Sequence, residues 1–121
     1  MKNIILQTVV ETSEFAKQAR VCMEDNVRIQ FIDFIAKNPL AGDIIPGTGG
    51  ARKMRWQSES HQGKRGGVRV IYYYHDEYMP IYLFTVYKKN QYENISAIEK
   101  EILYKIIKLI VKEYKGRAGN E

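Results

Sequence analysis

The chain has 121 residues, of which 45% are hydrophobic and 27% charged, and its formal net charge is +5. This size and composition predict one globular domain spanning residues 1–121, with a flexible tail over residues 116–121. Cys22 is the single cysteine, which excludes an intramolecular disulfide, and the opening residues lack the apolar run of a signal peptide. Because Lys or Arg interrupts every long apolar stretch, we expect a cytoplasmic protein with no membrane partner.

The excess positive charge is concentrated in one segment. Residues 52–69 contain six Lys or Arg and one Glu, whereas residues 1–51 have a net charge of −1 and residues 70–121 of +1. Cations placed this close repel one another and add little to folding. The concentration therefore favours an anionic partner, most commonly nucleic acid. The competing interpretation is a solvated basic face with half-buried strand tyrosines beside it.

The predicted elements follow the order β-α-α-β-β-β-α. A β-branched segment predicts a strand over residues 3–9, and apolar spacing predicts helices over 12–22 and 24–37. The glycine-rich residues 42–50 precede a strand-like segment and lack the Lys-Ser/Thr pair of a phosphate-binding loop, which favours a turn. Residues 52–57, 68–75 and 81–88 predict the strands of an antiparallel meander.

A helix is predicted at the C-terminal end. Ser96 and Glu99 have the spacing of a capping box. The apolar stripe expected to pack on the sheet consists of Ile98, Ile102, Ile106, Leu109 and Ile110, with Lys100, Lys105, Lys108 and Lys112 away from it. The expected fold class is α+β: a small antiparallel sheet of about four strands, with N-terminal helices and a C-terminal helix covering one side.

Strand alternation sorts the concentrated cations by face. Lys53 and Arg55 share one face, whereas Arg52 points to the other with two residues expected in the core, Met54 and Trp56. Arg69 lies on the face of the apolar residues two and four positions after it. Further cations lie in the loop and at the end of the last strand: Lys64, Arg65, Lys88 and Lys89. If the strands are neighbours, four or five cations converge on one open face.

Such a face suits phosphodiesters, with nearby tyrosines available to stack unpaired bases where they are exposed. RNA carries its own nucleophile, so cleavage requires a base for the 2′-hydroxyl, cations for the phosphorane and a donor for the leaving oxygen. Lys53 is the best placed base if neighbouring cations favour its neutral form. His61 lies in a loop, and His75 beside Asp76 is better explained as a structural histidine. We expect neither a metal site nor a cofactor.

Several segments in combination resemble the RelE/HigB superfamily of bacterial toxins, closest to the HigB-type branch. They are GDIIPGTGGARKMRW, GKRGGVRVIYYY, YLFTVYKKN and the C-terminal helix, within residues 24–112. The resemblance implies a toxin of a type II toxin–antitoxin system that cleaves mRNA on the ribosome. It also implies an antitoxin encoded beside the toxin, often a helix-turn-helix protein of the HigA type. The toxin would contact operator DNA only through this antitoxin.

The resemblance also implies site residues. The family's basic pair corresponds to Lys53 and Arg55, the arginine of the next strand to Arg69, and the basic residue ending the last strand to Lys89; these four are the expected catalytic residues. Expected RNA-binding residues are Lys64, Arg65, Lys88, Asn90 and Tyr92. The tyrosine that some relatives carry after the last strand corresponds to Ile95 here, and Tyr92 is an approximate substitute.

Two other functions stay open. Toxins of the ParE type use the same fold to poison DNA gyrase, although that activity does not require phosphate-binding cations on this sheet face. A non-catalytic RNA-binding module would retain RNA in a salt-sensitive way without cutting it.

Overall fold

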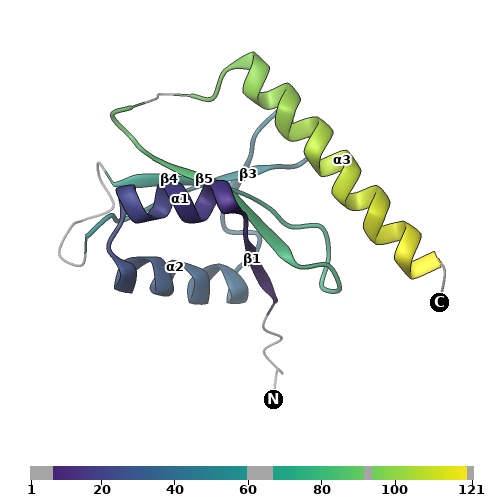
Figure 1. Cartoon of the computed structure of the whole chain (residues 1–121), viewed down its shortest axis with the longest axis horizontal. Helices are drawn as coiled ribbons and strands as arrows, with labels where there is room; N and C mark the ends of the chain where they lie inside the picture. The colour runs from purple at the N-terminus through teal and green to yellow at the C-terminus, as the bar shows by residue number, and fades with distance from the viewer. Residues whose placement is uncertain (1–6, 60–66, 92–93, 120–121) are drawn as a thin grey trace.

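The computed structural model describes residues 7–59, 67–91 and 94–119. These residues form three helices and five strands. In chain order they are β1 (Val9–Glu11), α1 (Ser13–Cys22), α2 (Asp25–Lys37), β2 (Asp43–Ile44), β3 (Arg52–Trp56), β4 (Val68–Tyr73), β5 (Ile81–Lys88) and α3 (Ala97–Gly119) (Figure 1). The α+β class and the two N-terminal helices are as predicted.

The sheet is mixed, with the strand order β1-β5-β4-β3-β2. Strands β3, β4 and β5 form the predicted antiparallel meander. Two features differ from the expected four antiparallel strands. Strand β1 pairs in parallel with β5, and the chain between them, with two helices and three strands, is the long connection that a parallel pair needs. The two residues of β2 add an edge strand from within the glycine-rich connector.

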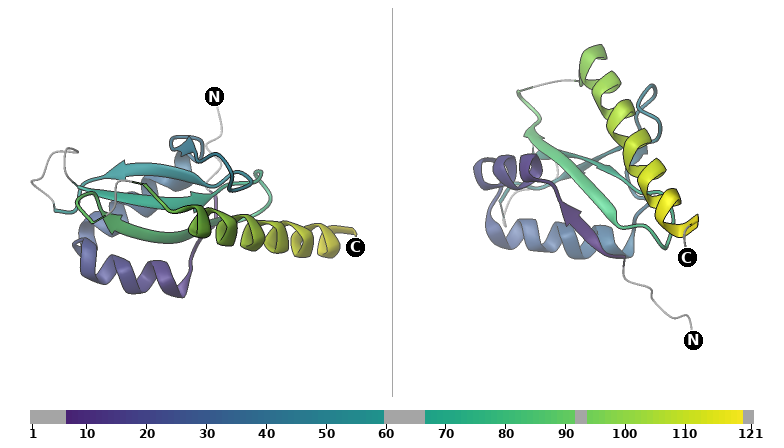
Figure 2. Two further views of the ribbon diagram at one scale, coloured as in Figure 1. Left: turned by 90° about the horizontal axis from the view of Figure 1, so that it is seen from above. Right: turned by 45° about the vertical axis from the view of Figure 1, so that its right-hand side comes forward.

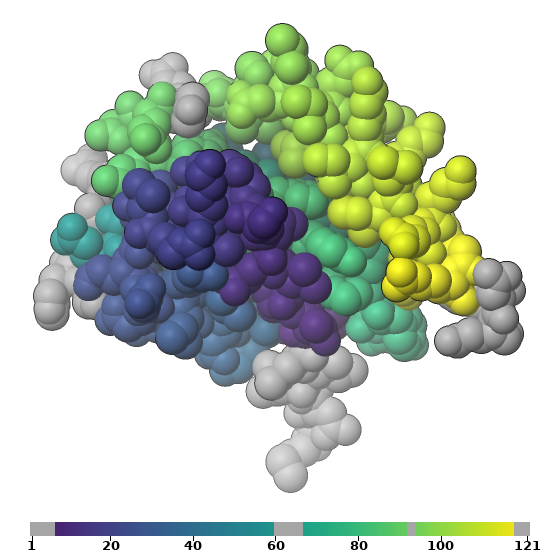
Figure 3. All heavy atoms as spheres, in the orientation of Figure 1, coloured from purple at the N-terminus to yellow at the C-terminus, as the bar shows by residue number. Residues whose placement is uncertain are grey.

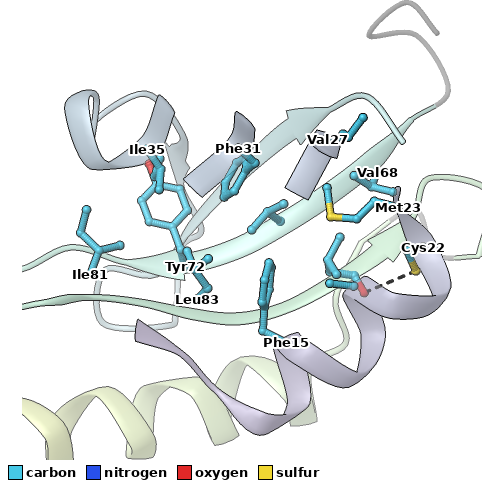
Figure 4. Packing of buried hydrophobic residues seen from close by; sticks show 13 residues of the cluster. Phe15, Cys22, Met23, Val27, Phe31, Ile35, Val68, Tyr72, Ile81 and Leu83 are labelled. Carbon is cyan, nitrogen blue, oxygen red and sulfur yellow. Dashed lines mark hydrogen bonds between the residues drawn. The ribbon is translucent and has the colours of Figure 1, made fainter. Parts of the chain in front are cut away.

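Helices cover both faces of the sheet, not one face as predicted. Helices α1 and α2 pack on the face that carries Val68, Val70 and Tyr72, and Figure 4 shows Phe15 and Phe31 within this core. Helix α3 packs on the opposite face, where Leu103 and Ile107 join a second buried cluster. Figure 2 shows α1 and α2 together on one side of the sheet, away from α3. Both faces are apolar because neighbouring residues of β4 alternate between two cores.

Thr12 fixes the start of α1 against the sheet. Its hydroxyl accepts a hydrogen bond from the Phe15 backbone N–H at 3.1 Å and donates one to the Leu83 carbonyl at 2.8 Å. The first interaction satisfies a free amide of the helix terminus, and the second ties that terminus to β5. The observed β1 begins at Val9, and most of the strand predicted over residues 3–9 lies outside the described residues.

Helix α3 confirms the predicted capping box, but of the predicted apolar stripe Ile110 packs against the buried cluster whereas Ile98 does not. The Ser96 N–H donates to the Glu99 carboxylate at 3.0 Å, and the Glu99 N–H donates to the Ser96 hydroxyl at 3.1 Å. Leu103 and Ile107 are the side chains buried in α3, whereas Ile98 is 72% exposed. One apolar side of the helix carries Leu103 and Ile107, and another carries Ile98. The sheet covers only the side of Leu103 and Ile107. It also continues to Gly119, through most of the predicted tail.

The glycine-rich connector forms a tight turn after β2. Gly47, Gly49 and Gly50 have positive φ angles, which glycine adopts without steric cost. The buried Thr48 hydroxyl donates to the Ile45 carbonyl at 2.7 Å and accepts the Ala51 N–H at 2.9 Å. The turn thereby leads directly into β3 and sets the position of the cations that follow.

Candidate functional site

Three cations of adjacent strands lie on the face of the sheet that α3 covers in part. Strand β3 pairs with β4 so that Lys53 lies opposite Ile71 and Arg55 lies opposite Arg69. Ile71 belongs to the cluster under α3, and directly opposed residues share a face. Lys53, Arg55 and Arg69 therefore lie on the α3 side, as strand alternation predicts. We name these three residues the cationic face.

The cationic face extends as a row across three strands. Arg55 of β3, Arg69 of β4 and Tyr87 of β5 occupy consecutive paired positions. The Arg55 side chain is exposed, whereas Lys53 and Arg69 are half-buried. A guanidinium N–H of Arg69 donates to the Val68 carbonyl at 3.2 Å, which holds the side chain near the strand. Two arginines are thus held on neighbouring strands with their charges on one surface.

No carboxylate forms an ion pair with this face within the described ranges. The ion pairs found there join Arg28 to Glu11, His75 to Asp76, and helix residues four positions apart, and none includes Lys53, Arg55 or Arg69. Like charges on directly opposed strand residues destabilise a sheet. The arrangement is therefore suited to an external anion that binds both arginines.

Arg52 follows the prediction for the opposite face. Its guanidinium donates to the Gly42 carbonyl at 2.7 Å and, more weakly, to the Leu40 carbonyl at 3.4 Å. Met54 and Trp56 are partly buried and pack against the core beneath α1 and α2. Arg52 therefore holds the connector before β2 and does not join the cationic face.

The two lysines at the end of β5 lie differently. Lys88 pairs with Val68, whose side chain faces the α1–α2 core, so Lys88 does not lie on the cationic face. It lines a cavity with Glu24, Glu59 and Cys22. Burial raises the pKa of the Cys22 thiol, although nearby Lys88 lowers it. Lys88 lies on the opposite face from Arg69 because successive residues of a strand point to opposite faces of the sheet.

Lys89 follows β5 and continues its pairing with β4. Its backbone N–H donates to the Gly67 carbonyl at 3.2 Å. Alternation from Lys88 then returns position 89 to the α3 side of the sheet. Asn90 follows in an exposed turn. Three further predicted RNA-binding residues, Lys64, Arg65 and Tyr92, lie outside the described residues, as does His61.

Tyr87 is one of the tyrosines that the sequence offered for base stacking where exposed, and the structure gives it a different place. It occupies the position opposite Arg69, and its side chain is buried. Burial raises the pKa of its hydroxyl; the Arg69 charge lowers it and the Glu99 charge raises it. Tyr87 is therefore close enough to a cation of the face and to a carboxylate of α3 for both charges to act on its hydroxyl. The strand register could have identified it, because β5 alternation places Tyr87 on the face of Arg69.

The other strand tyrosines divide into buried and half-buried groups. Tyr72 and Tyr73 are buried, so neither ring is open to stack a base in this conformation. Tyr72 accepts the Gly42 N–H and donates to the Pro39 carbonyl, each at 2.8 Å. Tyr74 and Tyr82 are half-buried. Base stacking by the tyrosine run is thus limited to its half-buried members within the described chain.

A cavity of about 280 Å³ lies beside Lys53, between the edge of the sheet and the start of α3. Lys53, Asp43, Asn94 and Lys100 contribute polar groups to its lining. Asp43 pairs with Lys53 across β2 and β3 and so shares its face. Sequence reasoning treated Lys100 as a solvent-facing helix residue and did not foresee β2. The cavity adds a second ammonium group beside Lys53.

Nowhere in the described ranges do three His, Cys, Asp or Glu side chains gather as ligands for a metal ion. Within the same ranges, no helix has the length and apolar character needed to cross a membrane.

No protein-family model matches the chain. Its structure is similar to that of a double mutant of the Escherichia coli toxin RelE in the free state. The TM-score is 0.54, the sequence identity is 17%, and the match covers 80% of this chain and 95% of that chain. The chain therefore has a RelE-like fold. The HigB-type branch suggested by the sequence is not resolved by this likeness.

Proposed function

We propose that this RelE-like protein is the toxin of a type II toxin–antitoxin system and acts as a ribosome-dependent mRNA endonuclease. The observation that carries the proposal is the cationic face: Lys53, Arg55 and Arg69 lie together on adjacent strands. The ion pairs of the described residues leave all three available to an external anion. The likeness to a solved RelE toxin supports the same assignment at the level of the fold.

In the proposed reaction, the 2′-oxygen of RNA attacks the adjacent phosphorus, and the 5′-oxygen of the next nucleotide leaves. Lys53 is proposed to accept the 2′-hydroxyl proton as the general base. Arg55 and Arg69 bind the phosphate oxygens and stabilise the charge that increases in the transition state. The leaving 5′-oxygen takes up a proton from solvent, so the products are a 2′,3′-cyclic phosphate and a 5′-hydroxyl. Water then hydrolyses the cyclic phosphate to the 3′-phosphate.

Lys89 is proposed as a fourth phosphate-binding cation at the end of the same face. Position 89 returns to the α3 side just beyond the Arg69–Tyr87 pair. Tyr87 is proposed as a positioning residue for Arg69, because its buried hydroxyl is not available to RNA in this conformation. Lys64, Arg65, Lys88, Asn90 and Tyr92 are proposed to bind flanking phosphates or bases. Lys88 would do so from the opposite side of the sheet edge.

The proposed partners are the ribosome, its bound mRNA and an antitoxin. A cationic face is readily neutralised by an acidic segment of a partner. The antitoxin is proposed to be a helix-turn-helix protein of the HigA type, encoded beside this chain and responsible for any contact with operator DNA. The proposed place of action is the cytoplasm.

Mapping of RNA 5′ ends in a bacterial translation extract tests the function. Addition of the purified chain should produce new 5′-hydroxyl ends within translated reading frames, and an inhibitor of initiation should abolish them. Gyrase poisoning predicts loss of plasmid supercoiling instead. A non-catalytic RNA-binding module predicts retained but intact RNA. Intact mRNA in an actively translating extract would contradict the endonuclease assignment.

A further inference from the structure

The cavity of about 280 Å³ beside Lys53 has the composition of a small binding site. Its polar lining comes from Asp43, Lys53, Asn94 and Lys100, and its apolar lining includes Ile44, Pro46 and Ile95. Ile44 is 56% exposed, so a large aliphatic side chain is open to a ligand at this cavity. The volume is near the lower end for small-molecule pockets, which suits one flat ring system.

The two walls of this cavity are held together by close packing of the glycine-rich connector on α3. Residues 43–46 form one wall, and Lys100 in the first turn of α3 belongs to the other. A Cβ atom at Gly47 would meet Cδ of Lys100 at 3.9 Å, and one at Gly49 would lie 3.2 Å from the Tyr104 ring. Figure 2 shows the connector, in blue, beside α3. The absence of side chains at these two glycines therefore allows the cavity to exist before a ligand binds.

The charged groups of the cavity lack partners within the described chain. Asp43 lies opposite Lys53 across β2 and β3, yet no ion pair of the described residues includes Asp43, Lys53 or Lys100. No hydrogen bond engages the Asp43 carboxylate there either. A carboxylate at the border of an anion-binding face repels phosphates. Its position is favourable for RNA only if it binds a part of the nucleotide that carries N–H donors.

We infer that this cavity binds the guanine base of the nucleotide whose 2′-hydroxyl contacts Lys53. The inference rests on the proposed function for the position of the RNA, with the phosphate on Arg55 and Arg69. The base is attached to the ribose carbon next to the one that carries the 2′-hydroxyl. Because Lys53 lines the cavity, the base of that nucleotide lies at its opening. Lys53 and Arg55 are about 7 Å apart along β3, a separation that one ribose spans.

Asp43 distinguishes guanine from the other three bases of RNA. A carboxylate only accepts hydrogen bonds, through two oxygens side by side. The Watson–Crick edge of guanine presents two neighbouring donors, N1–H and N2–H. Adenine and cytosine present one donor beside an acceptor, and uracil presents one donor between two acceptors. Proteins read unpaired RNA bases on this edge.

Lys100 adds a second contact to the same edge. Its ammonium group has donors only, and guanine O6, next to N1, is an acceptor. Adenine has an amino group at the corresponding position and would be left without a partner there. The pair of Asp43 and Lys100 thus matches the order of donors and acceptors in guanine, while Ile44 and Pro46 offer apolar contact to the ring.

NMR titration of the full chain with nucleoside 3′-monophosphates tests the inference without ribosomes and without cleavage. These ligands place a base next to a 3′-phosphate, as in the proposed complex. Guanosine 3′-monophosphate should bind at least about tenfold more tightly than the adenosine, cytidine or uridine compounds. Inosine 3′-monophosphate lacks only the 2-amino group of guanosine and should bind several-fold more weakly than guanosine 3′-monophosphate.

The substitution Asp43→Asn should change the preferred base. The amide keeps the shape of the carboxylate but offers one donor and one acceptor, which match N1 and N6–H of adenine. Guanosine 3′-monophosphate should bind about tenfold more weakly, and the adenosine compound should bind at least as tightly as the guanosine compound. Asp33→Asn is the control, because it removes the same charge from α2 on the other side of the sheet. Figure 3 shows the blue atoms of α2 on the opposite side of the view from the yellow-green atoms of α3.

Lys100→Met provides a second variant at the same cavity. It keeps an unbranched apolar side chain and removes the donor to O6, so the preference for guanosine over adenosine should fall several-fold. Lys112→Met removes the same charge from an exposed position further along α3 and should leave all four dissociation constants unchanged. Circular dichroism checks that the variants are folded.

Several results would overturn the inference. They are equal binding of the four nucleotides, a preference for another base, and no binding of guanosine 3′-monophosphate. A fourth is an equal change for all four nucleotides in Asp43→Asn, which would show that Asp43 acts only through its charge. Failure of the proposed function has a different signature: a guanosine preference that depends on Asp43, together with intact mRNA in the translating extract, would support the base site and contradict the endonuclease.

Discussion

Arg55 lies directly opposite Arg69 across β3 and β4, so two guanidinium groups share one face without an ion pair to a described carboxylate. Opposed like charges cost a sheet stability. If the pair is present for binding, the protein should become more stable when one of the two charges is removed. Both the gain in stability and the loss of binding can be measured.

Replacement of Arg55 by Gln should raise the free energy of unfolding by a few tenths of a kcal/mol at low salt, because it removes the repulsion from Arg69. The gain should shrink in high salt, where repulsion is screened. Urea denaturation at two salt concentrations measures both. Arg20→Gln is the control: Arg20 lies in the last turn of α1, where a cation is favourable, so its loss should not stabilise the protein. A destabilised Arg55→Gln variant would show that Arg55 has a structural role instead.

Binding to single-stranded RNA should weaken steeply with salt. If three cations each displace one counterion, log K should fall against log salt with a slope of about −2. Arg69→Ala should reduce the magnitude of this slope by about 0.7, whereas Lys17→Ala on the exposed side of α1 should leave it unchanged. Filter retention of a short RNA across a salt series measures the slopes. Equal slopes for the unmodified chain and Arg69→Ala would show that Arg69 does not bind an RNA phosphate.

Loss of the Tyr72 hydroxyl should destabilise the fold. The buried hydroxyl satisfies both the Gly42 N–H and the Pro39 carbonyl, so Tyr72→Phe should lower the free energy of unfolding by about 1–3 kcal/mol. The control is Tyr78→Phe, because Tyr78 is exposed and its change should stay within about 0.5 kcal/mol. Urea denaturation of both variants at neutral pH gives the comparison, and equal stabilities would contradict the role given to Tyr72.

Stability should fall at alkaline pH. Burial raises the pKa of Tyr72, Tyr73 and Tyr87 above the ordinary tyrosine value. The folded state therefore holds these protons more tightly than the unfolded state. Their contribution is fully present below about pH 10 and is lost as pH rises through the higher folded pKa values. Denaturation at pH 8 and above pH 10 tests this, and Tyr73→Phe should show a smaller loss because one titrating group is removed. An equal loss would attribute the effect to other groups.

The sequence predicted the strands of the meander, the capping box and the sharing of one face by Lys53 and Arg55. These features depend on local chemistry: alternation, spacing and hydrogen bonds between residues close in the chain. The buried face of α3 was predicted wrongly because the helix carries two aliphatic rows. Ile98 belongs to one and Leu103 to the other, and only the position of the sheet decides which row it covers.

The features that could not be predicted depend on pairing between distant strands. The parallel β1–β5 pair requires knowledge of where the chain returns after two helices and three strands. Lys88 lies on the opposite face from Arg69 because of the register between β4 and β5, and a shift of one residue would reverse this placement. Tyr87 and Lys100 likewise acquire their places beside the cationic residues only through packing of β5 and α3. Spacing alone therefore located the cations but not the groups around them.

The most direct test of the central claim is mRNA cleavage in a translating extract by the unmodified chain and by Lys53→Ala, Arg69→Ala and Lys17→Ala. The proposed roles in proton transfer and charge stabilisation predict that Lys53→Ala and Arg69→Ala each lose about 100-fold or more in cleavage rate, with folding intact by circular dichroism. Lys17→Ala should cut at the unmodified rate. Full cleavage by Lys53→Ala and Arg69→Ala would contradict the assignment of the cationic face as the site of the reaction.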